Sequence, residues 1–410
     1  MNSLRIRMYN VGFGDCFLLF IPTEDGERTM LLDCGKHMSS KTGHGISEAA
    51  KDVVETVTQA GNPRIDVVVA THRHYDHISG FDLKLWEKVE VGEVWMPWTE
   101  EIGNPAADKL RRSQNRLAKA LCRRFDKDDP IGLLAFNSLS LSNDGSMAQL
   151  RSGFLGPPRL RYLPEKDGGL QTFTTDALPG VSVHALGPPH DPDVIALMDP
   201  PAGKFFPDEP DADRDELMAA PKPAEAAAVP FRDLFAPAYR LDTAGYNARF
   251  PELAEHASTA AIDERSQFDM FGAAASLEDA INGTSLVFAL DFGKACVLLA
   301  GDAEWGTWST MLGDPASRAV LGRTRAYKVS HHGSFNGTPS PFVDDLLPQD
   351  ATSLVSLGKM DMWPSIPRVS LLKALEGAQR RLVRTDKMPP QGSDVNVEGD
   401  LWVELSVPVG

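Results

Sequence analysis

The chain has 410 residues, of which 42% are hydrophobic and 24% charged, and its formal net charge is -16 at pH 7. These proportions are typical of a globular protein with enough apolar material for a core. The negative charge argues against a general nucleic-acid or membrane-surface binder, which usually carries a basic face. The four cysteines are scattered without C-x-x-C spacing, so neither a zinc ribbon nor a disulfide framework is indicated. No signal-peptide pattern and no run of about 20 apolar residues occurs, which predicts a cytoplasmic protein without a membrane span.

The first third of the chain alternates apolar runs with turns that are rich in Gly and Asp. Alternating or continuous apolar runs predict strands, and an apolar face that repeats every three to four residues predicts a helix. The predicted elements are strands at 4–9, 16–21 and 29–32, a helix at 47–60 and a strand at 65–70.

The middle of the chain is less regular. Segment 100–180 is predicted to be a partly helical insertion, with an amphipathic helix at 105–125. Segment 191–282 is an acidic insertion rich in Pro and Ala, and we expect residues 191–230 to be solvated or partly disordered. Its aromatic part, residues 231–272, either continues in that way or folds over the site as a cap.

Regular elements return in the last third. They are a hairpin formed by 285–290 and 295–300, strands at 326–329, 353–357 and 401–405, a helix at 368–378, and an earlier strand at 181–186. Strands that alternate with helices in both halves predict an α/β fold in which two mixed β-sheets pack together with helices outside. We expect one domain over 1–410.

A cluster of histidines and one aspartate directly follows the predicted strand at 65–70. His72, His74, Asp76 and His77 lie within six residues and include three of the ten histidines in the chain. Imidazole and carboxylate are ligands that zinc and similar divalent cations accept. Because the chain turns at a strand end, His72 and His74 can converge on one ion while Asp76 and His77 point toward a second. This pattern argues against a chance group of surface residues.

The run His72–His77 matches the H-x-H-x-D-H signature, and the chain therefore resembles the metallo-β-lactamase superfamily. Further matches are Asp33 after an early strand, Asp302 in Gly301-Asp302, and the pair His331-His332 after a late strand. The resemblance implies an αββα sandwich, in which two mixed β-sheets pack face to face with helices on both outer sides.

Within that superfamily, the chain is most similar to the soluble metallo-β-lactamase-like domain of bacterial DNA-internalisation (competence) proteins. The similar stretches are Asn10–Asp15, Asn282–Val287, Gly301–Glu304, His331–Ser334 and Arg384–Asp386. The two insertions match no family, and the turn Met362–Pro367 lacks the histidine that the family often has there. No membrane channel accompanies these motifs, so DNA uptake is not implied.

The resemblance implies two divalent metal ions, zinc in the first place, with manganese or iron also compatible. One ion would be held by His72 and His74 together with His190, and the other by Asp76, His77 and either His331 or His332. Asp302 would bridge the ions, and Asp76 and Asp302 would be the catalytic residues. Asp15 and Asp33 are expected to support the site by hydrogen bonds. His184 is expected in the core or on a sheet face, and no functional role is assigned to His37, His44 or His256.

The expected activity is metal-dependent hydrolysis by a bridging hydroxide, on a phosphodiester in a nucleotide, a nucleic acid or a phospholipid-like ester. The charge favours a small phosphodiester over long nucleic acid. Lys328, Arg323 and Arg325 are expected to be solvated surface charges rather than phosphate ligands. Two alternatives stay open: hydrolysis of a lactone, thioester or β-lactam, and a regulatory or binding protein whose metal site is structural.

Overall fold

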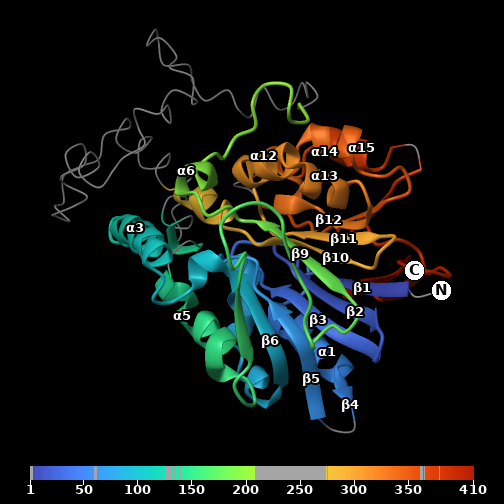
Figure 1. The fold of residues 1–410 in the computed structure, drawn as a ribbon. Coiled ribbons are helices and arrows are strands. Elements are labelled where there is room, and N and C mark those ends of the chain that lie inside the picture. Colours follow the sequence, from blue (N-terminus) through green and yellow to red (C-terminus); the bar gives the residue numbers. More distant parts are fainter. Residues whose placement is uncertain are drawn as a thin grey trace.

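Two mixed β-sheets and the helices beside them make up the part of the chain that the computed structural model describes (Figure 1). The described residues are 3–59, 62–125, 132, 135–137, 140–207, 274, 276–360, 363, 365–377 and 379–410. Most of segment 191–282, including residues 231–272, for which a cap was one of two alternatives, lies outside them. No helix among the described residues is long and apolar enough to cross a membrane.

The first sheet has the strand order β15-β16-β1-β2-β3-β5-β6-β7, with β4 paired to β5. Its strands are β1 (Ser3–Tyr9), β2 (Cys16–Thr23), β3 (Gly26–Cys34), β4 (Thr58–Gln59), β5 (Asn62–Val69), β6 (Glu90–Pro97), β7 (Arg159–Leu163), β15 (Val395–Glu398) and β16 (Trp402–Pro408). From β3 to β7 neighbouring strands run parallel. The carboxyl end of β3, which contains Asp33, and that of β5, which precedes His72, therefore lie at one edge.

The second sheet has the order β14-β13-β12-β11-β10-β9-β8. Its strands are β8 (Gln171–Phe173), β9 (Ser182–Gly187), β10 (Val287–Asp291), β11 (Cys296–Ala300), β12 (Thr324–Lys328), β13 (Thr352–Val355) and β14 (Arg381–Arg384). β10 and β11 pair antiparallel as the expected hairpin, whereas β11 to β14 run parallel. Asp302 and His332 follow β11 and β12, so they also share one edge.

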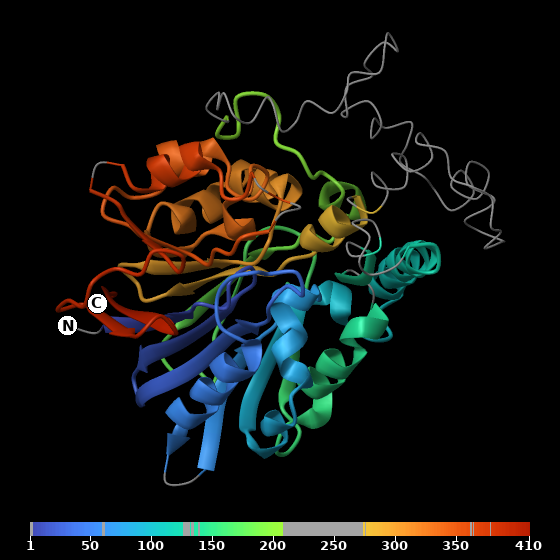
Figure 2. The same ribbon diagram turned by 180° about the vertical axis from the view of Figure 1, so that it is seen from behind.

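The two sheets face each other across a buried apolar layer, and helices cover their outer faces (Figures 1 and 2). Phe17 and Val69 of the first sheet contact the same core as Phe288 and Leu299 of the second. Burial of each such side chain contributes roughly 1.5–3 kcal/mol relative to exposure. Helix α1 (Ile46–Thr56) packs on the first sheet, and the second is covered by α12 (Trp305–Gly313), α13 (Pro315–Leu321), α14 (Ser340–Asp345) and α15 (Val369–Leu375).

Segment 100–180 is helical in its first half and joins both sheets in its second. The helices are α3 (Pro105–Cys122) and α5 (Ser140–Ala148), and the strands are the edge strands β7 and β8. α3 begins where Asn104 caps the backbone N–H groups of Ala106 and Ala107 and Pro105 takes the first helical position. Shorter helical turns are α2 (Tyr75–Ile78), η1 (Ser79–Asp82), η2 (Lys84–Lys88), η3 (Trp98–Glu100), η4 (Gln149–Gly153), α6 (Pro192–Ile195) and η6 (Ser330–Gly333).

Candidate metal centre

His72 and His74 face each other in the loop that follows β5. The His72 Nε2 and His74 Nδ1 atoms are 3.0 Å apart, and both rings are buried. Burial, reinforced for both rings by the nearby His77, holds the pKa of His72 well below its usual range and lowers that of His74 to about 3. Both rings therefore stay neutral at neutral pH, and the neutral imidazole is the form that binds a metal ion.

His77 lies between two carboxylates that come from different strand ends. Its Nδ1 is 2.9 Å from Asp33 Oδ2, and its Nε2 is 3.0 Å from Asp302 Oδ2. Burial opposes protonation of this ring, but Asp302 and Asp33 outweigh it and raise the pKa of His77 well above its usual range. Asp33, which the sequence suggested as a supporting group, also accepts hydrogen bonds from the backbone N–H and the hydroxyl of Thr71.

Four buried side chains converge on one point between the two sheets. Ligand atoms of Asp15, His77, Asp302 and His332 all lie within 4.8 Å of one another. Two carboxylates and two imidazoles form a donor set that suits a borderline divalent cation. Asp15, expected only in a supporting role, is thus placed among the candidate ligands themselves.

Buried polar atoms without hydrogen-bond partners lie around this point, in surroundings that would suit a cation. Among the described residues, neither Asp76 Oδ1 nor His332 Nε2 has a hydrogen-bond partner, although both are buried. A buried polar atom without a partner is costly. Asp76 Oδ2 and Asp302 Oδ2 lie 3.9 and 3.6 Å from His332 Nε2, so a single positive ion would satisfy several of these atoms together.

The two adjacent histidines of η6 have different surroundings. The Nδ1–H of His332 donates to the Ser356 carbonyl at 3.2 Å, which leaves the lone pair of its Nε2 for the cluster. His331 instead places Nδ1 3.1 Å from Asn336 Oδ1 and Nε2 3.2 Å from Asn282 Nδ2. The structure therefore brings His332 into the group and engages both ring nitrogens of His331 elsewhere. Both residues have a positive φ, 50° and 48°, which turns neighbouring side chains in different directions.

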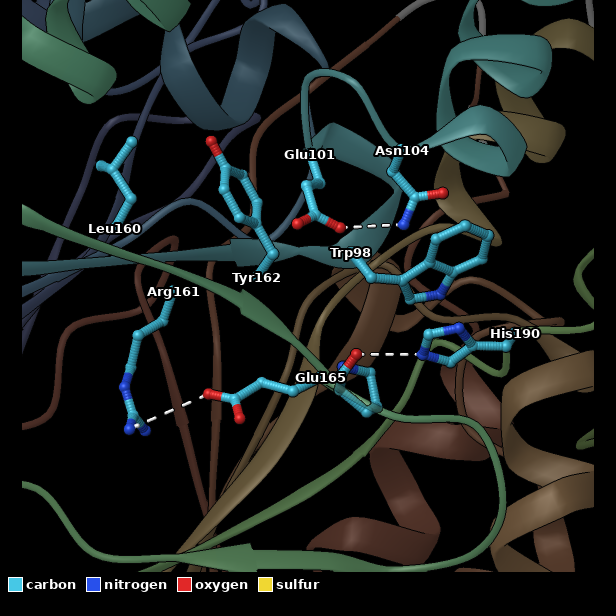
Figure 3. A pocket seen from close by; sticks show the side chains of 9 residues that line it. Trp98, Glu101, Asn104, Leu160, Arg161, Tyr162, Glu165 and His190 are labelled. Carbon is cyan, nitrogen blue, oxygen red and sulfur yellow. Dashed lines mark hydrogen bonds and ion pairs between the residues drawn. The ribbon is translucent and has the colours of Figure 1, made fainter.

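His190 lies in other surroundings, in a pocket beyond the end of β9 (Figure 3). Its ring stacks on Trp98 with centroids 4.6 Å apart, and its Nε2–H donates to the Pro164 carbonyl at 3.0 Å. This pocket is also lined by Glu101 and Glu165. The structure does not bring His190 into the group formed by Asp15, His77, Asp302 and His332.

Lys328 is buried beside the candidate ligands, so the expectation of a solvated surface charge was wrong for it. The side chain is only 2% exposed; its Nζ pairs with Asp15 and lies 3.4 Å from Asp302 Oδ1. Burial alone would lower the pKa of Lys328, but Asp15 and Asp302 outweigh it, and the pKa is raised. Arg323 and Arg325 lie away from this group and pair with Asp291 and Asp350.

His37, to which the sequence assigned no role, also lies near the cluster. It is 1% exposed, and its Nδ1 accepts the backbone N–H of Ser39 at 3.1 Å. The proton of the neutral ring must therefore sit on Nε2, an atom that has no partner among the described residues. Burial lowers the pKa of His37, and the nearby Asp76 opposes that shift. The sequence around His37 contains no motif with the spacing of metal ligands, so its place near the cluster could not be predicted from the sequence.

A neutral polar shell surrounds His331. Glu304 accepts hydrogen bonds from Asn336 Nδ2 at 3.1 Å and from Asn282 Nδ2 at 3.4 Å. Burial, followed by the charge of Asp279, raises the pKa of Glu304 well above its usual range. Glu304 therefore holds a proton more strongly than an exposed glutamate would.

No protein-family model matches this chain, and no curated protein matches it either. The function must therefore be argued from the site and its chemistry.

Proposed function

We propose that this protein is a metal-dependent hydrolase with a metallo-β-lactamase-like αββα fold, and that it cleaves a phosphodiester. Two facing sheets with outer helices support the fold, because they place the ends of β3, β5, β11 and β12 around one centre. The H-x-H-x-D-H run and the late aspartate and histidine motifs support the superfamily.

The convergence of Asp15, His77, Asp302 and His332 on one buried point is the observation that carries the proposal. These four residues would hold one divalent cation, and His72 and His74 beside them would contribute to a second, with Asp302 within reach of both. When bound, such ions would polarise the scissile ester and lower the pKa of water toward about 7.

The residues of the chain itself prepare this chemistry. The Asp33 carboxylate fixes the ring of His77, and the Ser356 carbonyl fixes that of His332, so that Nε2 of each faces the cluster. Burial opposes ionisation of Asp76, but nearby charges, first of all that of His77, outweigh it and lower the pKa of Asp76. The Asp76 carboxylate therefore stays ionised at neutral pH and can accept a hydrogen bond from the attacking water.

A phosphodiester is proposed as the substrate because of the similarity to competence-type domains. The net charge of -16 favours a small diester over a long polyanion, since the protein as a whole repels the latter. The ammonium group of Lys328 is already paired with Asp15 and Asp302. It therefore offsets carboxylate charge in the centre rather than offering a free cation to the substrate.

Metal analysis followed by a substrate screen tests the proposal. The purified protein is stripped with a chelator, reloaded with zinc, manganese or iron, and assayed with bis-p-nitrophenyl phosphate, a thioester and a lactone. We expect the reloaded protein to contain metal and to hydrolyse the phosphate diester, and we expect the stripped protein to be inactive. Turnover of only the thioester or the lactone would replace the phosphodiester by another ester class. No metal, or metal without turnover, would favour a regulatory or binding role.

A further inference from the structure

Arg73 stands between the first two histidines of the motif, and its side chain is 3% exposed. A guanidinium group stays charged in proteins, so its burial is costly unless hydrogen bonds and an opposite charge compensate. His72 and His74 face each other on one side of the loop. The hydrogen-bond and charge partners of Arg73 lie outside the motif, in segment 100–180.

The partners of the Arg73 side chain come from segment 100–180. Its Nη2 donates to Gln114 Oε1 of α3, and its Nη1 lies 3.6 Å from Glu100 Oε1 of η3. The other oxygen of Glu100 lies 3.6 Å from Nη2 of Arg151. The backbone is held too, because Asn143 of α5 donates its side-chain amide to the Arg73 carbonyl.

Gln114 connects this loop to the opposite wall of the centre. While its Oε1 accepts from Arg73, its Nε2 donates to the Ala280 carbonyl at 3.1 Å. Ala280 belongs to the helical segment 276–282, and Asn282 of that segment lies 3.2 Å from His331 Nε2. One buried glutamine therefore spans the segments that carry His72 and Asn282.

We propose that Arg73 is a positioning residue, and that η3, α3 and α5 form a clamp that fixes the spacing of His72 and His74 through Arg73 and Gln114. This inference rests on the metal centre of the proposed function. Asn143 of the clamp donates to the Arg73 carbonyl, and Gln114 accepts from the Arg73 side chain. Without these two contacts, the peptide between the two histidines can rotate. Residues that orient metal ligands from outside typically change metal affinity about 10–100-fold when they are removed.

Cobalt(II) binding to the full chain tests the clamp, because the visible spectrum of bound cobalt reports ligand geometry without turnover. We expect Arg73→Met to weaken cobalt binding about 10–100-fold and to change the visible band. Arg73→Lys keeps the charge, and we expect it to recover part of the affinity. Arg380→Met is the matched control, since Arg380 is also a partly buried arginine but bonds the Val343 and Leu347 carbonyls, outside the clamp.

Two substitutions of Gln114 keep the test decisive if Arg73→Met fails to fold. Gln114→Leu removes both hydrogen bonds and should weaken cobalt binding, whereas Gln114→Glu keeps the acceptor for Arg73 and should bind more tightly than Gln114→Leu. Wild-type affinity and an unchanged spectrum in both Gln114 variants would overturn the clamp, even with a lower melting temperature. If the wild-type protein itself binds no cobalt, the proposed metal centre fails and the clamp fails with it.

Discussion

Asp33 Oδ2 lies 2.9 Å from Nδ1 of His77, so one carboxylate at the end of β3 sets the orientation of a ring that follows β5. Asp33 has a φ of 53°, a left-handed conformation that Asp and Asn tolerate better than most residues. Two further hydrogen bonds from Thr71 join the same carboxylate to the loop. The left-handed backbone at Asp33 therefore directs its carboxylate toward the loop that carries Thr71 and His77.

Asp33→Asn should weaken metal binding while the fold is retained. Asn tolerates the same φ and has nearly the same volume, but its amide lacks the charge and one of the two acceptor oxygens that serve His77 and Thr71. We expect zinc affinity to fall about 10–100-fold in a competition titration with a chromogenic chelator. Thr71→Val, which removes one hydroxyl hydrogen bond to Asp33 and leaves the His77 contact, should have a smaller effect. Equal affinities for wild type and Asp33→Asn would contradict this role.

Substitution of the two adjacent histidines should separate a ligand from a neighbour. His332→Ala removes an Nε2 atom that faces Asp302 and Asp76, so we expect the protein to lose about one equivalent of metal. His331→Ala breaks contacts to Asn282, Asn336 and Glu304, which lie outside the ligand group, and the metal content should be retained. Metal-to-protein ratios of both variants, measured after gel filtration, provide the check. The opposite result would assign the ligand to His331.

Asp302→Ala should abolish turnover and binding of the metal ion held by the group of Asp15, His77, Asp302 and His332. Asp302 contacts His77, His332 and Lys328, and its loss removes one of the two carboxylates that pair with the buried Lys328 in the described part of the chain. Activity on bis-p-nitrophenyl phosphate and metal content by elemental analysis are the two measurements. Asp25→Ala is the control, because it removes an exposed carboxylate from the turn between β2 and β3, outside the candidate site. Full activity of Asp302→Ala would sink the two-metal model.

Strands with a simple apolar pattern could be predicted from the sequence, but β6 could not. Its residues Glu90, Gly92 and Glu93 interrupt the alternation that marks a strand. Glu93 is nevertheless buried, because it accepts hydrogen bonds from Trp95 Nε1 and Thr175 Oγ1. Tertiary contacts of this kind compensate a buried carboxylate, and no local pattern reveals them.

The candidate site was predictable only where its residues form a local motif. His72, His74, Asp76 and His77 are close in sequence, whereas Lys328 is read as a surface charge until the fold brings Asp15 beside it. A position directly after a strand was not enough to predict a place in the cluster, since His190 follows β9 but stacks on Trp98.

At the far end of β10, Asp291 takes part in a polar cluster that should make stability depend on pH. Asp291 Oδ2 lies 2.8 Å from both Arg323 Nη2 and His184 Nε2, and Oδ1 accepts the backbone N–H of Gly293. Burial opposes ionisation, but the hydrogen bonds from Arg323 and His184 outweigh it and hold the pKa of Asp291 well below its usual range. His184, expected in the core or on a sheet face, lies within β9 and is buried.

Because the pKa of Asp291 is lower in the folded protein than the unfolded value of about 3.9, the ionised group stabilises the fold above that pH. This contribution is lost as the pH falls below about 4 toward the folded pKa. Asp291→Asn should therefore lower the free energy of unfolding at pH 7 by about 1 kcal/mol, after allowance for solvent screening. The difference from wild type should shrink at pH 3, as measured by urea unfolding at both pH values. Asp350→Asn, in the more exposed pair with Arg325, should change little at either pH. A difference that is as large at pH 3 as at pH 7 would show that Asp291 acts by packing rather than by charge.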